Sequence, residues 1–150
     1  LPRAVLMAGY KDTSSSDAVY MLDWYAYGIG KVPVKVATTY QNISDAWSLL
    51  IDQKWHDRIT AIKANDGGLS YVEFFEYRKN KMSIPLFNIY CATGSNREYY
   101  AERTDLIQLG QTTQAIYFAK LTNEGEQSEL ALTGDEIKAR FSLVNQAWNN

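Results

Sequence analysis

The sequence predicts one α+β domain: a mostly antiparallel sheet of about five to seven strands, packed by a C-terminal amphipathic helix and one shorter helix. Three observations predict it: several short β-prone segments, a strong hairpin signal at Asn65–Gly68, and a helical apolar period that starts at Ile137. The length of 150 residues fits one domain, and no internal repeat, low-complexity tract or linker divides the chain.

Composition and charge exclude several classes of protein. A hydrophobic fraction of 46% with 21% charged residues is typical of globular proteins and argues against disorder, collagen and coiled coil. Fifteen basic and seventeen acidic residues leave no basic excess, so no nucleic-acid partner is expected. The longest apolar stretch, Ala4–Ala8, is far shorter than the ~20 residues that span a membrane. The chain begins at Leu1, which predicts either a removed leader or lipid anchor, or an excised domain.

The first half of the chain predicts two strands. Residues 18–27 are aromatic and β-prone and lead into Gly28–Gly30, which predicts a strand that closes in a turn. Residues 31–40 alternate three valines with two lysines, as a strand with one wet face does. Pro33 lies inside this segment and cannot donate a ladder hydrogen bond, so we expect an edge strand.

Residues 43–52 fit two structures. In the first, Ser44 caps a helix. In the second, the segment is a strand, because the apolar residues Trp47, Leu49 and Ile51 occupy every second position. Periodicity does not decide between helix and strand in a segment this short.

The middle of the chain carries the clearest β signals. Residues 58–64 and 69–78 flank Asn65–Gly68, whose glycines supply the positive φ of a tight hairpin. The return strand has apolar residues on both faces, so we expect it to be central and covered on both sides. Residues 84–92 predict the next strand, in which Phe87, Ile89 and Cys91 share a face.

Helix signals follow. Ser95 and Glu98 have the spacing of a capping box, which predicts a short helix over residues 96–103. Residues 106–109 and 115–121 predict a last pair of strands around Gly110, and residues 123–128 a polar loop.

A second capping box predicts the C-terminal helix. It pairs Thr133 with Glu136. An apolar stripe follows, which should lie on the sheet, at Ile137, Phe141, Val144 and Trp148.

Half of the chain resembles a known family. The segments WSLLIDQKW, RITAI, VEFFEY, LFNIYC and AIYFAKL, between Trp47 and Leu121, and the helix TGDEIKARFSLV are similar to an uncharacterised family of small extracytoplasmic or lipoprotein-borne domains of Gram-positive Firmicutes. Asp52 stands where the family has a proline. The resemblance favours a strand at 47–51 and implies a location outside the cytoplasm, secreted or lipid-anchored, with no catalytic residue. By analogy, the element order also resembles the Mog1/PsbP-like fold.

Reactive side chains are scarce. One cysteine cannot form an internal disulfide, and one Cys with one His falls short of the about four ligands of a zinc site, so no metal or cofactor is expected. A Cys91–His56 nucleophilic pair, oriented by Asp57 or Asn88, is the catalytic alternative. Against it, Cys91 shares an apolar strand face, where a thiol is inert.

Paired carboxylates do not suggest a catalytic site either. Glu73 and Glu76 are three residues apart on one strand and therefore lie on opposite faces. No pair resembles the acid and nucleophile of a glycosidase.

Aromatic residues are the compositional excess, with eleven Tyr and four Trp. Such side chains build cores, but they also form platforms for sugars and anchors for protein partners. Two clusters stand out: Trp24, Tyr25 and Tyr27, and then Tyr99 and Tyr100. Neighbours on a strand point to opposite sides, so at least one of Trp24 and Tyr25 leaves the core. That side is either covered by a helix or partner domain, or is an exposed recognition patch.

These observations predict a non-catalytic extracytoplasmic binding or interaction module of the cell envelope. The two aromatic clusters would dock a protein or glycan partner. Two alternatives stay open: a small hydrolase that uses Cys91 and His56, and a purely structural assembly domain.

Overall fold

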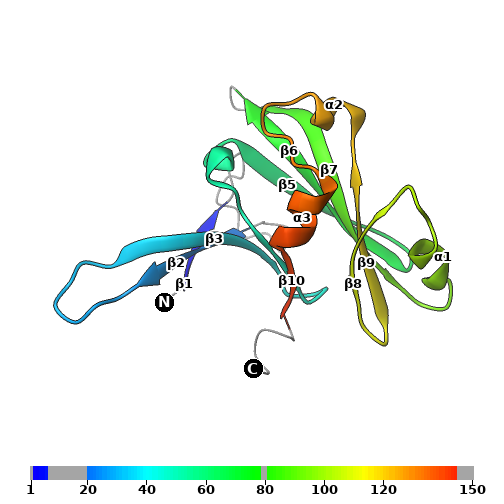
Figure 1. The fold of residues 1–150 in the computed structure, drawn as a ribbon, viewed down its shortest axis with the longest axis horizontal. Helices are drawn as coiled ribbons and strands as arrows, with labels where there is room; N and C mark the ends of the chain where they lie inside the picture. The colour runs from blue at the N-terminus through cyan, green and yellow to red at the C-terminus, as the bar shows by residue number, and fades with distance from the viewer. Residues whose placement is uncertain (1, 7–19, 79–80, 145–150) are drawn as a thin grey trace.

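The computed structural model describes residues 2–6, 20–78 and 81–144. Within these ranges it contains ten strands in two antiparallel five-stranded sheets, together with short helices (Figure 1). The fold is therefore α+β and mostly antiparallel, as predicted. The prediction of one sheet of five to seven strands is wrong, because the strands divide between two sheets.

The first sheet has the order β1-β2-β3-β4-β10. Its strands are β1 (Pro2–Leu6), β2 (Tyr20–Ala26), β3 (Val34–Asn42), β4 (Trp47–Leu50) and β10 (Phe141–Leu143). The second sheet has the order β5-β6-β7-β9-β8. Its strands are β5 (Ile59–Asp66), β6 (Leu69–Arg78), β7 (Lys81–Thr93), β8 (Ile107–Gln111) and β9 (Ala115–Leu121).

Four short helical segments connect or cover the strands. They are η1 (Gln53–Trp55), α1 (Glu98–Ala101), α2 (Asn123–Glu126) and α3 (Gly134–Arg140). Within the described ranges, none of these helices has the length and apolar character needed to cross a membrane.

Aromatic rings join the two sheets in one core. Tyr40 and Trp47 of the first sheet have ring centroids 5.2 Å apart, and Tyr40 meets Phe74 of the second sheet edge to face at 5.5 Å. Phe74 in turn stacks on Phe87 at 4.9 Å. Such pairs add roughly 0.5–1.5 kcal/mol each beyond their burial, so the core holds the sheets together.

The first sheet corrects the prediction of an edge strand at residues 31–40 and decides between helix and strand for residues 43–52. Pro33 precedes β3, so it need not donate to the ladder, and β3 lies between β2 and β4 rather than at an edge. Trp47–Leu50 is a strand and not a helix, with Trp47 and Leu49 facing the core. The partner strands β3 and β10 decide this, because they take up its backbone hydrogen bonds on both sides.

The second sheet follows the predicted hairpins. β5 and β6 pair around Gly67, whose φ is +62°, and β6 lies between β5 and β7 as predicted. The common face of Phe87, Ile89 and Cys91 is buried, and β8 pairs with β9.

The helices depart further from the sequence pattern. The capping box of Thr133 and Glu136 forms, but the helix ends at Arg140. Phe141 opens β10, which pairs with β4, so the predicted continuous stripe is wrong. Pairing with β4 therefore outweighs the helical spacing of the apolar residues in this part of the sequence. Trp148 lies outside the described residues.

Two smaller predictions are corrected in detail. The short helix predicted over residues 96–103 forms as α1, but Ser95 does not cap it; α1 begins after Arg97, which makes no side-chain cap hydrogen bond. The segment predicted as a polar loop contains α2, which begins after Thr122, whose hydroxyl accepts a hydrogen bond from the Gly125 amide.

Candidate interaction site

The ribbon of β2 and β3 extends beyond the rest of the first sheet. Among the described residues, β1 pairs with β2 as far as Trp24, and β4 pairs with β3 from Thr39 onward. Residues 25–38 therefore form a two-stranded ribbon, here called the arm, which projects from the body of the molecule (Figure 1).

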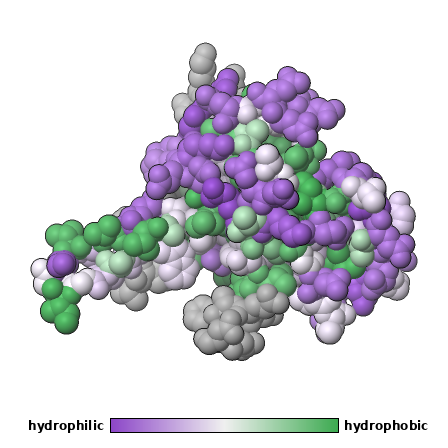
Figure 2. Space-filling model, in the orientation of Figure 1, coloured by the Kyte–Doolittle hydropathy of each residue, from purple (hydrophilic) through white to green (hydrophobic). Residues whose placement is uncertain are grey.

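The arm exposes a group of large apolar side chains. Five of the eight large hydrophobic side chains that are exposed in the described part of the chain lie on it: Tyr27, Ile29, Val32, Val34 and Val36. Ile29 is fully exposed and Val32 is 82% exposed. Figure 2 shows hydrophobic surface along the projecting arm, whereas hydrophilic surface covers much of the visible body. Exposed apolar groups gathered in this way are candidates for interaction sites.

Local geometry shapes the arm. A bulge lies between Trp24 and Tyr25, where the register changes from Trp24↔Ala37 to Tyr25↔Lys35. Bulges increase the twist and bend of a ribbon. At the tip, the Lys31 amide donates to the Gly28 carbonyl at 3.1 Å, and Gly30 takes a φ of +74° that favours glycine.

Polar contacts on both faces fix the base of the arm. The Trp24 indole Nε1 donates to Thr39 Oγ1 at 2.9 Å. On the other face, Thr38 Oγ1 donates to Asp23 at 2.7 Å and Lys35 pairs with Asp23 at 3.0 Å. Burial disfavours the charge of Asp23, but the Thr38 hydrogen bond and Lys35 outweigh it and hold the pKa of Asp23 below its ordinary value.

The first predicted aromatic cluster divides between two roles. Trp24 and Tyr25 are partly buried, and Trp24 is engaged at the base. Tyr27 is exposed beyond them. The aliphatic residues Ile29, Val32, Val34 and Val36 were not predicted as site residues, because alternating valines also describe a core-facing strand. The signal that could have found them is the near absence of polar side chains on both sides of the turn.

The second predicted cluster lies elsewhere. Tyr100 stacks on Phe118 with centroids 5.1 Å apart, as part of a small apolar cluster between α1 and β9. Tyr99 is exposed, with the Arg103 guanidinium 5.7 Å from its ring centroid. Figure 1 shows α1 at the opposite end of the molecule from the arm, so the two clusters do not form one site.

The structure does not bring Cys91 and His56 together. Cys91 pairs with Ser70 on β6, whereas His56 precedes Ile59, which pairs with Glu76. Six residues of β6 separate these positions, a span of about 20 Å. His56 is exposed and its Nε2 lies 3.3 Å from Asp57, while the proposed alternative orienter, Asn88, donates to the Tyr90 hydroxyl.

The Cys91 thiol is also in the wrong protonation state for a nucleophile. Burial, helped by the nearby charge of Asp45, raises the pKa of Cys91 from its ordinary 9.0 to about 11. The thiol therefore stays protonated at neutral pH, and the side chain serves the core.

We expect the folded protein to protect Cys91 from thiol reagents. A pKa raised by two units lowers the thiolate fraction at neutral pH about a hundredfold, and burial slows access further. Labelling with a maleimide should be slow until denaturant is added. As a control, Thr93→Cys in a Cys91→Ser background places an exposed thiol on the same strand and should label rapidly. Equal rates for the two thiols would contradict the assignment of Cys91 to the core.

A buried carboxylate is the polar feature that sequence reasoning missed. Glu76 is fully buried and accepts hydrogen bonds from Arg78 Nε and, at 3.0 Å, from Ser128 Oγ. Arg58 lies 3.8 Å from Glu76 and also pairs with Glu129. The signal was present: Glu76 follows Val72 and Phe74 at a spacing of two and so shares their core-facing side.

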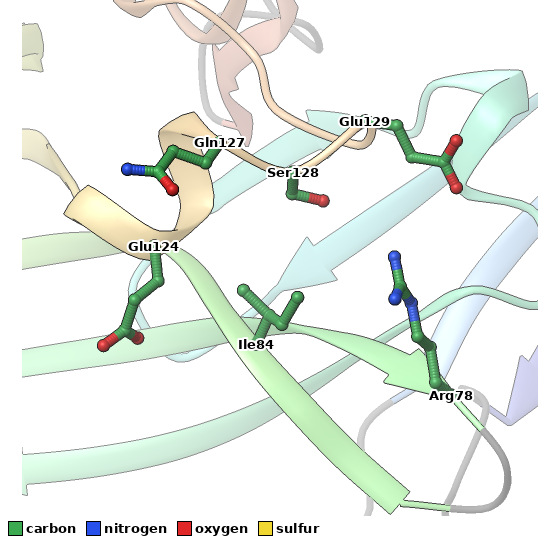
Figure 3. Close-up of a pocket in the computed structure, with 6 residues that line it drawn as sticks. All are labelled: Arg78, Ile84, Glu124, Gln127, Ser128 and Glu129. Carbon is green, nitrogen blue, oxygen red and sulfur yellow. The ribbon is translucent and has the colours of Figure 1, made fainter.

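This ion-pair network borders an open cavity of about 740 Å³. Figure 3 shows Arg78 extending from the end of β6 toward Glu129, opposite the segment that follows α2. The lining residues are Arg78, Ile84, Glu124, Gln127, Ser128 and Glu129. Because Arg58 and Arg78 are already engaged by carboxylates, the network links β5, β6 and the segment after α2 rather than offering free groups to a ligand.

Metal ligation and similarity to known proteins add no further site. Across residues 2–6, 20–78 and 81–144, no three His, Cys, Asp or Glu side chains are grouped so that they could hold a metal ion. Comparisons with protein-family models, curated proteins and solved structures found no match to this chain. The arm is therefore the feature from which a function is best inferred.

Proposed function

We propose that this protein is a non-catalytic binding module that docks through its arm. The observation that carries the proposal is the exposure of Tyr27, Ile29 and Val32 at the end of a projecting ribbon. A two-stranded ribbon alone is marginally stable in water, and its apolar surface gains free energy when a partner covers it. The exposed apolar side chains of the arm therefore favour docking.

The chemistry of the arm favours an apolar partner over a glycan. Between Ala26 and Ala37 the only polar side chains are those of Tyr27, Lys31 and Lys35. Sugar recognition needs several hydrogen-bonding groups around an aromatic platform. The aliphatic side chains at the tip of the arm have no hydrogen-bonding groups. Tyr99 and Tyr100 lie at the other end of the molecule and are not part of this proposal.

The resemblance noted in the sequence of residues 47–121 supports a proposal about where the protein acts. We propose that the protein works outside the cytoplasm, secreted or lipid-anchored at the cell surface, as a module of the envelope. A Mog1/PsbP-like arrangement is likewise a proposal, which the order of strands and helices supports by analogy.

A cysteine at the tip of the arm tests docking whatever the partner is. Val32→Cys places a thiol at an exposed position, and it should react rapidly with a membrane-impermeant maleimide in the purified protein. Addition of isolated Gram-positive cell envelopes should slow the reaction about tenfold, because docking covers the tip. Ile43→Cys, exposed but outside the arm, is the matched control and should react at an unchanged rate.

A disabling variant shows that protection requires the apolar tip. Tyr27→Ser with Ile29→Ser in the Val32→Cys protein should abolish protection while the melting temperature stays unchanged, since both side chains are exposed. Trp24 is unsuitable for this purpose, because its substitution also removes the hydrogen bond to Thr39. Unprotected tip thiols in the presence of envelopes would contradict docking through the arm. Protection in concentrated purified protein alone would favour the assembly-domain alternative instead.

A further inference from the structure

Charge on the arm has one sign. From Trp24 to Ser44 the only charged side chains are Lys31 and Lys35, and no acidic residue occurs. Lys35 pairs with Asp23 at the base. Lys31, close to the tip, forms no ion pair with any residue in the described part of the chain. The end of the arm is therefore apolar and cationic in a chain with a net charge of −2.

Side chains change in character along the arm. Trp24 and Tyr25 lie near the body, Tyr27 follows, and Ile29 with Val32 occupies the tip. Trp and Tyr favour the headgroup level of a bilayer, whereas aliphatic side chains favour the greater depth beyond it. Lysine stems reach along apolar surface and keep their ammonium groups at the phosphates.

From these observations we propose that the arm docks on an anionic lipid surface. The proposal rests on the proposed function, whose apolar partner it identifies as a membrane. Ile29 and Val32 enter the interfacial region, Tyr27 lies at headgroup level, and Lys31 contacts lipid phosphates. From Trp24 to the turn the arm reaches about 15 Å, enough to insert the tip while the body stays outside.

Insertion is shallow for a physical reason. The tip is a turn whose backbone makes one internal bond, from the Lys31 amide to the Gly28 carbonyl, and its other polar backbone groups need water. The headgroup region supplies that water, whereas the hydrocarbon core does not.

Polar content favours lipid over a protein partner. Protein interfaces surround an apolar centre with a polar rim and form about one hydrogen bond per 100–200 Å². The end of the arm offers only the Tyr27 hydroxyl and the Lys31 ammonium group as polar side-chain groups. A lipid surface needs no more than these.

Vesicle co-sedimentation tests the proposal. The wild-type protein should bind vesicles of phosphatidylcholine with about one-third phosphatidylglycerol, and should bind phosphatidylcholine alone about fivefold more weakly, because Lys31, unpaired among the described residues, is attracted to anionic headgroups. Added salt should weaken binding. Ile29→Ser with Val32→Ser should weaken it about a hundredfold through lost apolar burial, and Lys31→Gln about fivefold. Ile43→Ser, which removes an exposed apolar side chain outside the arm, should change nothing.

The outcomes of the vesicle and envelope experiments distinguish the lipid proposal from the broader proposal that the protein docks through its arm. If envelopes protect the Val32→Cys thiol but vesicles of either composition do not bind, the arm docks on a protein and the lipid proposal is wrong. Equal binding by the wild-type protein and the Ile29→Ser, Val32→Ser variant would also overturn it, since lipid contact would then lie elsewhere. Absence of protection by envelopes would overturn the proposed function itself.

Discussion

Replacement of Glu76 by Gln is expected to lower the free energy of unfolding by about 1–3 kcal/mol, because its buried carboxylate loses the charge-assisted hydrogen bonds from Arg78 and Ser128. Glu76 is fully buried beside Arg78, Arg58 and Ser128. The amide keeps the shape of the side chain but carries no charge to balance the arginines. Urea denaturation followed by circular dichroism measures the change.

A second glutamate provides the matched control. Glu129 pairs with the same Arg58, but its side chain is 64% exposed, so Glu129→Gln should cost less than about 1 kcal/mol. The contrast isolates burial, since both variants remove one carboxylate from the same arginine. Similar small losses for both variants would show that the buried charge is not needed for stability.

Replacement of Gly125 by Ala is expected to destabilise the protein by about 3 kcal/mol, although alanine is the better helix former by about 1 kcal/mol. Gly125 lies in α2 against β7, and a Cβ there would sit 2.6 Å from the Leu86 Cα. Backbone cannot rotate away as a side chain can, so α2 must shift. The shift would also disturb Thr122, whose hydroxyl donates to the Pro85 carbonyl.

The same substitution at Gly134 is the control for this prediction. A Cβ at Gly134 would meet the Cδ1 methyl of Ile107 at 2.9 Å, and the end of that side chain can move. Gly134→Ala should therefore change stability by less than about 1 kcal/mol. Thermal melts of both variants give the comparison, and a harmless Gly125→Ala would mean that α2 does not pack closely on β7.

Local patterns predicted most of the second sheet. The hairpin at Asn65–Gly68 is where the sequence placed it, because adjacent strands joined by a short turn depend on nearby residues. The helix cap at Thr133 was predictable for the same reason. Where an element depended on distant residues, prediction failed: α3 ends at Arg140 because β4 supplies a strand partner for Phe141.

Only half of the candidate site was accessible from the sequence. Trp24, Tyr25 and Tyr27 were singled out as an aromatic cluster before glycines, and Tyr27 is exposed on the arm. The exposure of Val34 and Val36 was not predicted from their alternation, since alternating valines are equally typical of a buried strand. In the described part of the chain, β1 and β4 pair with the ribbon at its base, and this pairing is a tertiary feature.

By itself, the sequence determined the positions of turns, caps and alternating faces, because these depend on side chains within a few residues of one another. Tertiary structure alone decided the division into two sheets, the pairing of Glu76 with Arg58 and Arg78, and the projection of the arm beyond its neighbours. These features depend on which distant strands pair and how far each pairing runs, and neighbouring residues carry no information about that.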